Sequence, residues 1–249
     1  MNKTKRILPP YCQIEWEKFR CRPQGITANA HDVMVPLQNL LDHTVTRILD
    51  DEDIQLQIDQ LVEKNDGESI LIEFIYKYGF DGTGGMMKVK QVTDEVHKPG
   101  ALFASNMVSL QLISFVKGKI YILFVNACCN SAASCRPIRH QYISESREVI
   151  ANEDNRLNSE IQSLKKLEWT DKVTVGYFGI ESMNDGKVQN VVNENPSSQR
   201  CPICLCGPRD FNDLERFFRA NVDLLAKLCI GVLHVGLRGF EHICKVDKS

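Results

Sequence analysis

The sequence predicts an α/β fold, in which several β-strands follow N-terminal helices and precede a helical C-terminal segment. Three observations predict it. Apolar residues with helical spacing run through residues 37–62. Four apolar runs typical of strands lie between residues 70 and 180, and a second strong helical stripe begins near residue 213.

Composition sets the first limits on function. The chain has 249 residues, 43% apolar and 25% charged, which is typical of a folded globular protein. Its 30 basic and 32 acidic side chains give a net charge of −2, so binding to nucleic acid would depend on local basic patches. Because no apolar run approaches the roughly 18 residues of a membrane helix, and no signal-peptide core follows the basic N-terminus, we expect an intracellular protein without a membrane partner.

The N-terminal part predicts two helices. Leu37, Leu40, Leu41, Val45 and Ile48 have the spacing of one amphipathic helix. The acidic residues 50–53 then mark the start of a second helix, where negative charge complements the helix dipole, and residues 65–67 end it.

The middle of the chain predicts the sheet. Residues 70–80 are rich in β-branched and aromatic side chains, and residues 173–180 form a similar run. Residues 110–116 and 120–126 predict a hairpin, because a short link containing Gly118 joins them. A charged helical pattern runs from about Glu145 to Leu167, with Ser144 as a candidate cap.

Two predicted strands each lead to an Asp-Gly pair, Asp81-Gly82 and Asp185-Gly186. If these strands are neighbours, their carboxylates can share Mg²⁺ ions, which favour carboxylate oxygens and support phosphodiester chemistry. The ordinary alternative is that Asp-Gly is a common turn dipeptide. Glu145 is a candidate third acid, or a first-turn residue that complements its helix dipole.

Basic and cysteine-containing motifs suggest two further sites. Lys88, Lys90, Arg136 and Arg139 flank the acids in sequence and can neutralise a DNA backbone, or can be ordinary solvated residues. The Cys201-Pro-Ile-Cys204 motif has the spacing of half a tetrahedral Zn²⁺ site. The missing ligands can come from Cys206, His234, His242 and Cys244. Plain cysteines and a redox dithiol are the alternatives.

Four segments in the same order resemble the Transib transposases and the related catalytic subunit of the V(D)J recombinase. They are residues 79–85 (Gly-Phe-Asp-Gly-Thr-Gly-Gly), 135–139 (Cys-Arg-Pro-Ile-Arg), 185–188 (Asp-Gly-Lys-Val) and 201–204 (Cys-Pro-Ile-Cys). The resemblance covers roughly residues 75–240. It places Asp81 on the first catalytic aspartate, Asp185 on the second, and Glu145 on an additional acid of the active site.

The resemblance implies an RNase H-like mixed-sheet core with N-terminal helices and a C-terminal helical insertion that contains the zinc motif. The implied domains are residues 1–66, 67–192 and 193–249. The implied activity is Mg²⁺- or Mn²⁺-dependent DNA nicking and strand transfer, on terminal repeats or similar DNA ends, by a nuclear homodimer with an accessory recombinase subunit. Asp81 and Asp185 would hold the metal, with Cys201 and Cys204 on Zn²⁺.

The resemblance has one departure. The family completes its zinc site with two histidines spaced five apart and then supplies a final catalytic glutamate, and residues 205–249 match neither feature. We therefore expect this polypeptide alone to be inactive. Two other functions stay open: a domesticated remnant that binds DNA or protein without catalysis, and an unrelated zinc-containing interaction module.

Overall fold

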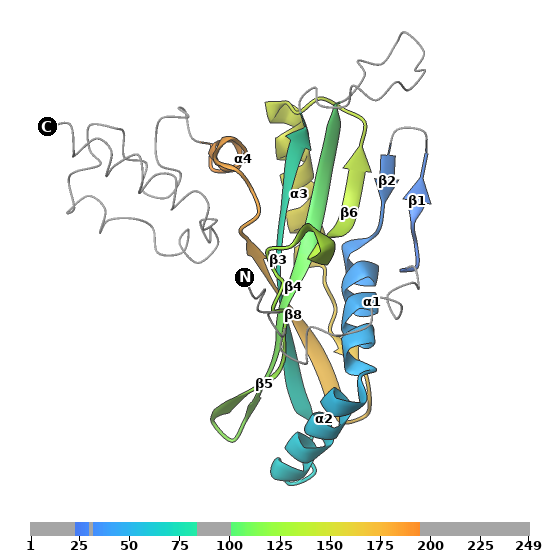
Figure 1. Ribbon diagram of the computed structural model, residues 1–249, viewed down its shortest axis with the longest axis vertical. Helices are drawn as coiled ribbons and strands as arrows, with labels where there is room; N and C mark the ends of the chain where they lie inside the picture. The colour runs from blue at the N-terminus through green and yellow to red at the C-terminus, as the bar shows by residue number, and fades with distance from the viewer. Residues whose placement is uncertain (1–22, 30–31, 84–100, 195–249) are drawn as a thin grey trace, which may run out of the picture. The chain divides into compact units, whose positions relative to one another are not determined.

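The computed structural model describes residues 23–29, 32–83 and 101–194 (Figure 1). Within them the chain is mixed α/β, with four α-helices and one eight-stranded sheet. The strands are β1 (Thr27–Ala28), β2 (Asp32–Met34), β3 (Ile70–Thr83), β4 (Leu102–Val116), β5 (Lys119–Val125), β6 (Arg136–Gln141), β7 (Leu167–Glu168) and β8 (Val173–Glu181). Their order in the sheet is β1-β2-β6-β4-β3-β8-β7, and β5 pairs with β4 off this path.

The chain divides into two compact units, each assembled from segments far apart in sequence. Unit 1 contains Met1–Tyr76, Met107–Arg139 and Ser159–Gly179. Unit 2 contains Lys77–Asn106, His140–Asn158 and Ile180–Ser249. The strands β3, β4, β6 and β8 therefore contribute residues to both units. The predicted domains, residues 1–66, 67–192 and 193–249, stay a prediction.

Both predicted N-terminal helices are confirmed. Helix α1 (Leu37–Leu49) buries the predicted apolar stripe, and α2 (Glu52–Lys64) buries a second one. The Asp51 side chain caps α2 by accepting a hydrogen bond from the backbone N–H of Asp53 at 3.1 Å. The helices follow one another along the chain in unit 1 (Figure 1).

The predicted hairpin is confirmed as β4 and β5. Its turn consists of Lys117 and Gly118, which have φ values of 48° and 76°. Two consecutive left-handed residues match the twist of the strands in a tight hairpin, and glycine takes this conformation without steric cost. Strand β4 begins at Leu102, well before the predicted start at residue 110.

The two predicted strands that lead to Asp-Gly pairs, β3 and β8, are neighbours in the sheet. They run parallel, because Ile70 N–H bonds the Lys172 carbonyl at one end and Met183 N–H bonds the Tyr78 carbonyl at the other. Strand β4 runs antiparallel to β3: the Ser114 hydroxyl donates to the Leu71 carbonyl, and the Phe80 and Phe103 rings lie 6.0 Å apart. The predicted mixed sheet is therefore confirmed.

Helix α3 (Arg147–Gln162) is shorter than the sequence predicted, and its cap is a different residue. Ser146, not Ser144, lies at the start: its hydroxyl oxygen accepts a hydrogen bond from Val149 N–H at 3.2 Å, and its carbonyl begins the helical pattern. The cap prediction was wrong by two residues because the chain turns later than the charge pattern indicated. The helix ends before Leu167, which instead lies in strand β7.

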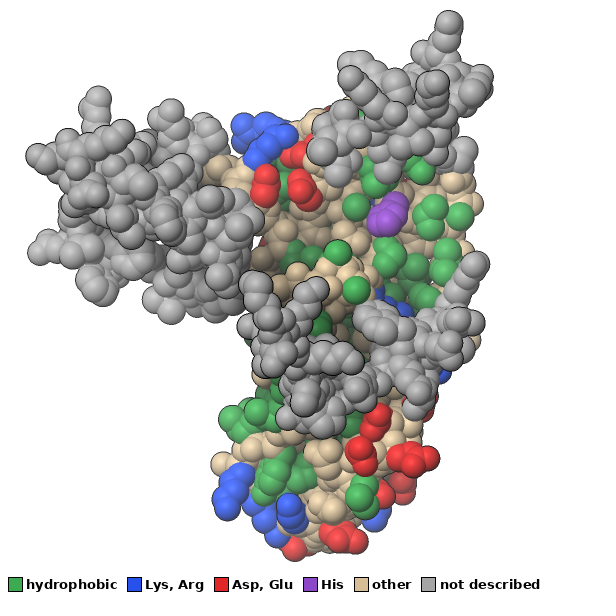
Figure 2. All heavy atoms as spheres, viewed as in Figure 1, with side chains coloured by type: hydrophobic (Ala, Val, Ile, Leu, Met, Phe, Trp, Pro, Cys, Tyr) green, Lys and Arg blue, Asp and Glu red, His purple; other side chains and the backbone are tan. Residues whose placement is uncertain are grey.

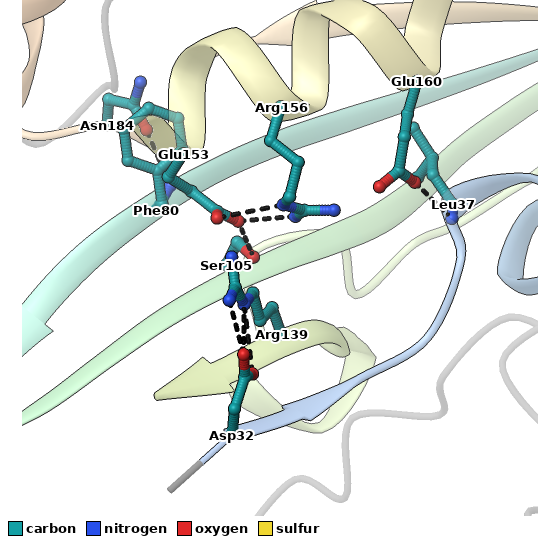
Figure 3. Close-up of polar contacts among 9 residues, drawn as sticks. All are labelled: Asp32, Leu37, Phe80, Ser105, Arg139, Glu153, Arg156, Glu160 and Asn184. Carbon is teal, nitrogen blue, oxygen red and sulfur yellow. Dashed lines mark hydrogen bonds and ion pairs between the residues drawn. The ribbon is translucent and has the colours of Figure 1, made fainter. Parts of the chain in front are cut away.

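Unit 2 has its own core, which joins α3 to β3 and β4 through side chains from each element. The buried apolar residues of this core are Tyr78, Phe80, Phe103, Ile150, Leu157 and Val188. Beside them lies a buried polar group from α3, Glu153, with 1% of its side chain exposed. Glu153 accepts hydrogen bonds from Ser105 Oγ at 2.6 Å and from the Arg156 guanidinium at 2.5 and 3.0 Å (Figure 3). This network fixes α3 to the start of β4.

Candidate metal centre

The three predicted acids lie in one unit and come from three elements. Asp81 is near the end of β3, Asp185 is the N-terminal capping residue of α4 (Gly186–Val192), and Glu145 lies in the loop before α3. Figure 2 shows acidic and basic side chains gathered on the surface over the ends of β3 and α4. The chain segments that carry the two aspartates are joined although they are far apart in sequence. Phe80, which precedes Asp81, and Asn184, which precedes Asp185, are hydrogen-bonded at a separation of 104 positions.

The pKa of Asp81 shows that the three charges interact. Burial raises the pKa of the Asp81 carboxyl, and the negative charges of Asp185 and then Glu145 raise it further. A hydrogen bond from Gly82 N–H at 2.8 Å and the charge of Lys187 lower this pKa, but the net shift is upward. A pKa raised by neighbouring carboxylates is typical of acids that share a functional site.

Glu145 packs directly against the backbone that follows Asp81. A Cβ atom on Gly82 would lie 2.5 Å from Glu145 Cβ and 2.7 Å from its Oε2. A side chain at position 82 would therefore displace Glu145, so glycine is required here for close approach. Glu145 is mostly buried, with 12% of its side chain exposed, and it forms an ion pair with Lys187 at 2.7 Å. Glu145 therefore contacts α4 through Lys187.

Each carboxylate is satisfied by a group of this chain. Asp81 accepts from Gly82 N–H, and Asp185 accepts from Val188 N–H at 2.8 Å. Glu145 has its ion pair, although its Oε1 accepts no aligned hydrogen bond among the described residues. In this arrangement no three His, Cys, Asp or Glu side chains of the described residues converge on a single point.

The donor set nevertheless fits a hard divalent cation in kind. Three carboxylates carry negative charge, and Mg²⁺ and Mn²⁺ take carboxylate oxygens with the remaining positions filled by water or phosphate. The structure places Glu145 against Gly82, the residue that follows Asp81 in β3. Asp185 would have to release the Val188 N–H to join them.

The buried Asn184 fixes the loop that carries Asp185. Asn184 Oδ1 accepts a hydrogen bond from Phe80 N–H at 2.7 Å (Figure 3). Its Nδ2 donates to Glu181 Oε1 at 2.5 Å. The β3 backbone approaches so closely that a Cβ on Gly79 would lie 2.5 Å from Asn184 Oδ1 and 2.7 Å from the Met183 carbonyl carbon. Asn184 was not predicted to have a role, because a polar residue beside an Asp-Gly turn signals only a loop.

The two predicted DNA-binding arginines with described positions belong to unit 1 and have partners within it. Arg136 lies against Thr44 Oγ1 at 2.5 Å and His43 Nδ1 at 2.9 Å. Its burial, with the charge of Arg47, lowers the pKa of Arg136 to about 10. Arg139 forms a bidentate contact with both carboxylate oxygens of Asp32 (Figure 3). Their predicted role in DNA binding stays a prediction.

Several predicted residues lie outside the described part of the chain. Lys88 and Lys90 belong to the segment 84–100, and the zinc motif with Cys201 and Cys204 belongs to the segment 195–249. Of the described cysteines, Cys128, Cys129 and Cys135 are free thiols. No helix among the described residues has the length and apolar character needed to cross a bilayer.

The sequence was compared with models of protein families and with curated proteins, and neither comparison finds a match.

Proposed function

We propose that this chain carries the catalytic core of a DNA transposase or recombinase similar to the Transib family, built on an RNase H-like sheet. One observation carries the proposal: Asp81, Glu145 and Asp185, which the motifs singled out, belong to one unit, in which Glu145 lies against Gly82 beside Asp81. The parallel pairing of β3 with β8 supports it, because adjacent parallel strands bring their C-terminal ends to the same edge of a sheet.

In this proposal Asp81, Asp185 and Glu145 hold Mg²⁺ or Mn²⁺. The bound metal would activate a water or 3′-hydroxyl and stabilise the leaving oxygen of a DNA phosphodiester. The residues of this chain supply the negative charge that retains the ion, and the Gly82 backbone leaves room for the acid opposite. Asn184 holds the Asp185 loop against β3 and so acts as a positioning residue.

The proposal extends to partners through the resemblance alone. The substrate would be DNA with terminal inverted repeats or recombination-signal-like ends, contacted by Lys88, Lys90, Arg136 and Arg139. The assembly would be a nuclear homodimer, with an accessory recombinase subunit. Cys201 and Cys204 would contribute to a structural Zn²⁺ site. No residue of this chain is assigned to the family's final catalytic glutamate.

A nicking assay tests the proposal. Supercoiled plasmid is incubated with the protein in Mg²⁺ or Mn²⁺, and the conversion to open circles is compared among the wild type, Asp81→Asn and Asp185→Asn. Any nicking that this chain performs should depend on the metal, and both substitutions should abolish it. Nicking that persists in both variants would exclude these acids from catalysis.

A second candidate function is a DNA- or protein-binding module without catalysis. It is favoured by the observation that all three carboxylates have partners in the chain, so the cluster is stable without a metal. This function predicts DNA affinity that is the same with Mg²⁺ or with EDTA and is unchanged in Asp81→Asn. An affinity that requires Mg²⁺ would count against it.

A further inference from the structure

Two arginines of unit 1 lie near each other without an acid to neutralise them. Arg136 is the first residue of β6, Arg47 lies in the last turn of α1, and both side chains are half-buried. Burial and then the charge of Arg47 lower the pKa of Arg136, because water screens the repulsion between the two cations incompletely. Among the described residues, neither guanidinium forms an ion pair with a carboxylate. The pair therefore carries an unneutralised charge of +2.

Arg136 is held in place by neutral groups of α1. Its Nη1 donates to Thr44 Oγ1 at 2.5 Å, and its Nη2 donates to His43 Nδ1 at 2.9 Å. A guanidinium can only donate, so His43 accepts at Nδ1 and its imidazole is neutral. The Thr44 hydroxyl gives its own hydrogen to the Leu40 carbonyl at 2.5 Å. These contacts orient the guanidinium, and each terminal nitrogen keeps a second hydrogen for another acceptor.

Arg47 lies on the face of α1 that Arg136 contacts, because residues four apart in a helix, such as His43 and Arg47, are neighbours on its surface. The Nε atom of Arg47 is buried and forms no hydrogen bond within the described part of the chain. An enclosed donor without an acceptor costs free energy, and a second cation nearby adds to that cost. An anionic acceptor from outside the chain would remove both costs.

We propose that Arg47 and Arg136 form a binding site for a phosphate group on this face of α1. The site does not depend on the proposed catalysis, because both arginines belong to unit 1 and neither belongs to the acid cluster. Phosphate fits in two respects. Its oxygens accept the paired donors of guanidinium groups, and a phosphate monoester carries a charge of about −1.5 to −2 at neutral pH, which offsets the two arginines.

Calorimetric titration of inorganic phosphate into the full chain, in EDTA and at low ionic strength, tests the site. We expect the wild type to bind one phosphate per chain. Arg47→Met keeps the apolar stem and removes the guanidinium, so it should bind phosphate at least about tenfold more weakly. Arg147→Met is the matched control, since it is the same substitution at an exposed position of α3, and it should bind within about twofold of the wild type.

Thermal unfolding in phosphate-free buffer separates binding from a structural role of Arg47. Arg47→Met should melt no lower than the wild type, because it loses no hydrogen bond of Nε and no longer repels Arg136. Added phosphate should then raise the melting temperature of the wild type more than that of Arg47→Met. If Arg47→Met melts well below the wild type without phosphate, the guanidinium stabilises the folded chain itself and the inference is overturned.

Competition identifies the source of the phosphate. Displacement of inorganic phosphate by a blunt DNA duplex without terminal phosphates assigns the site to the DNA backbone, and displacement only by the same duplex with 5′-phosphates assigns it to DNA ends. A site for which neither duplex competes takes a small phosphate compound. The absence of saturable phosphate binding to the wild type, or equal weakening in Arg47→Met and Arg147→Met, would overturn the inference. The proposed function is judged separately, because nicking and Mn²⁺ binding measure the acid cluster.

Discussion

The side-chain oxygen of Asn184 accepts a hydrogen bond from the backbone N–H of Phe80 at 2.7 Å. These two residues immediately precede the two aspartates of the cluster, so one hydrogen bond joins the chain segments that carry Asp185 and Asp81. Asn184 is buried, and its amide also donates to Glu181. The relative position of the two aspartates therefore depends on a neutral side chain that takes no part in the proposed chemistry.

Replacing Asn184 by Ala should lower the free energy of unfolding by about 1–3 kcal/mol, because Phe80 N–H loses its acceptor in a buried environment. Urea denaturation measures the change. Asn155→Ala, the same substitution at an exposed position of α3, should change stability by less than about 0.5 kcal/mol. Equal effects at the two positions would show that the Asn184 hydrogen bonds do not hold this loop.

Replacing Gly79 by alanine should destabilise the protein, whereas replacing Gly186 by alanine should not. A Cβ on Gly79 would lie 2.5 Å from Asn184 Oδ1 and 2.7 Å from the Met183 backbone, so Gly79→Ala forces β3 away from the loop. We expect a loss of at least about 1–3 kcal/mol, the usual cost of overpacking. A Cβ on Gly186, at the start of α4, would have no atom within 4 Å, so Gly186→Ala should be neutral or stabilising by up to about 1 kcal/mol.

Thermal unfolding in EDTA compares the two glycine variants. A stability of Gly79→Ala equal to that of the wild type would contradict the close approach of β3 to the Met183–Asn184 backbone. The Gly186 variant controls for a general effect of replacing glycine in this part of the chain.

Asp81→Asn should stabilise the metal-free protein at neutral pH. The folded-state pKa of Asp81 is raised, so its stabilising contribution is present below the unfolded-state pKa of about 3.9 and is lost as the pH rises through the folded-state value. Asparagine does not ionise, so the variant escapes this loss. Because Asp81 is only partly buried and solvent screens its charge, we expect a gain of only a few tenths of a kcal/mol.

The measurement is the unfolding free energy of wild type and Asp81→Asn from pH 3 to pH 7 in EDTA. The difference between the two should grow in favour of the variant as the pH rises. Asp59→Asn, the same change on the exposed face of α2, serves as the comparison. A difference that instead shrinks with rising pH would mean that neither burial nor the neighbouring acids disfavour the Asp81 charge.

The buried ion pair of α3 predicts that substitutions of Glu153 and Arg156 have strongly coupled effects on the free energy of unfolding. Arg156→Ala leaves the buried Glu153 carboxylate without the guanidinium, which should cost about 3–5 kcal/mol. Adding Glu153→Gln to this variant removes the buried charge and should restore part of the stability. A double-mutant cycle by urea denaturation checks the coupling, and additive effects would contradict it.

Much of the fold was predictable from the sequence because it depends on local patterns. The stripe from Leu37 to Ile48 and the turn at Gly118 are set by residues close in the chain, and both were confirmed. The expectation that Asp81 and Asp185 lie near each other came from a simple rule about neighbouring strand ends, and the strands β3 and β8 that lead to them are neighbours. The exact start of α3 at Arg147 was not predictable, because Ser144 and Ser146 are equally good caps in sequence.

The candidate site was less predictable than the fold around it. The Glu145–Lys187 ion pair and the Asn184–Phe80 hydrogen bond join residues 42 and 104 positions apart, and no local pattern records such contacts. One signal was available for Lys187. A lysine two residues after a helix-capping aspartate opposes the helix dipole, which indicates a nearby group of negative charges.

The most direct test of the proposed metal site is calorimetric titration of Mn²⁺ into the wild type, Asp81→Asn and Asp185→Asn. We predict saturable binding to the wild type that is lost in both variants, since each removes a carboxylate of the same cluster. Binding of equal affinity and stoichiometry in all three proteins would contradict the assignment of Asp81 and Asp185 to a metal site.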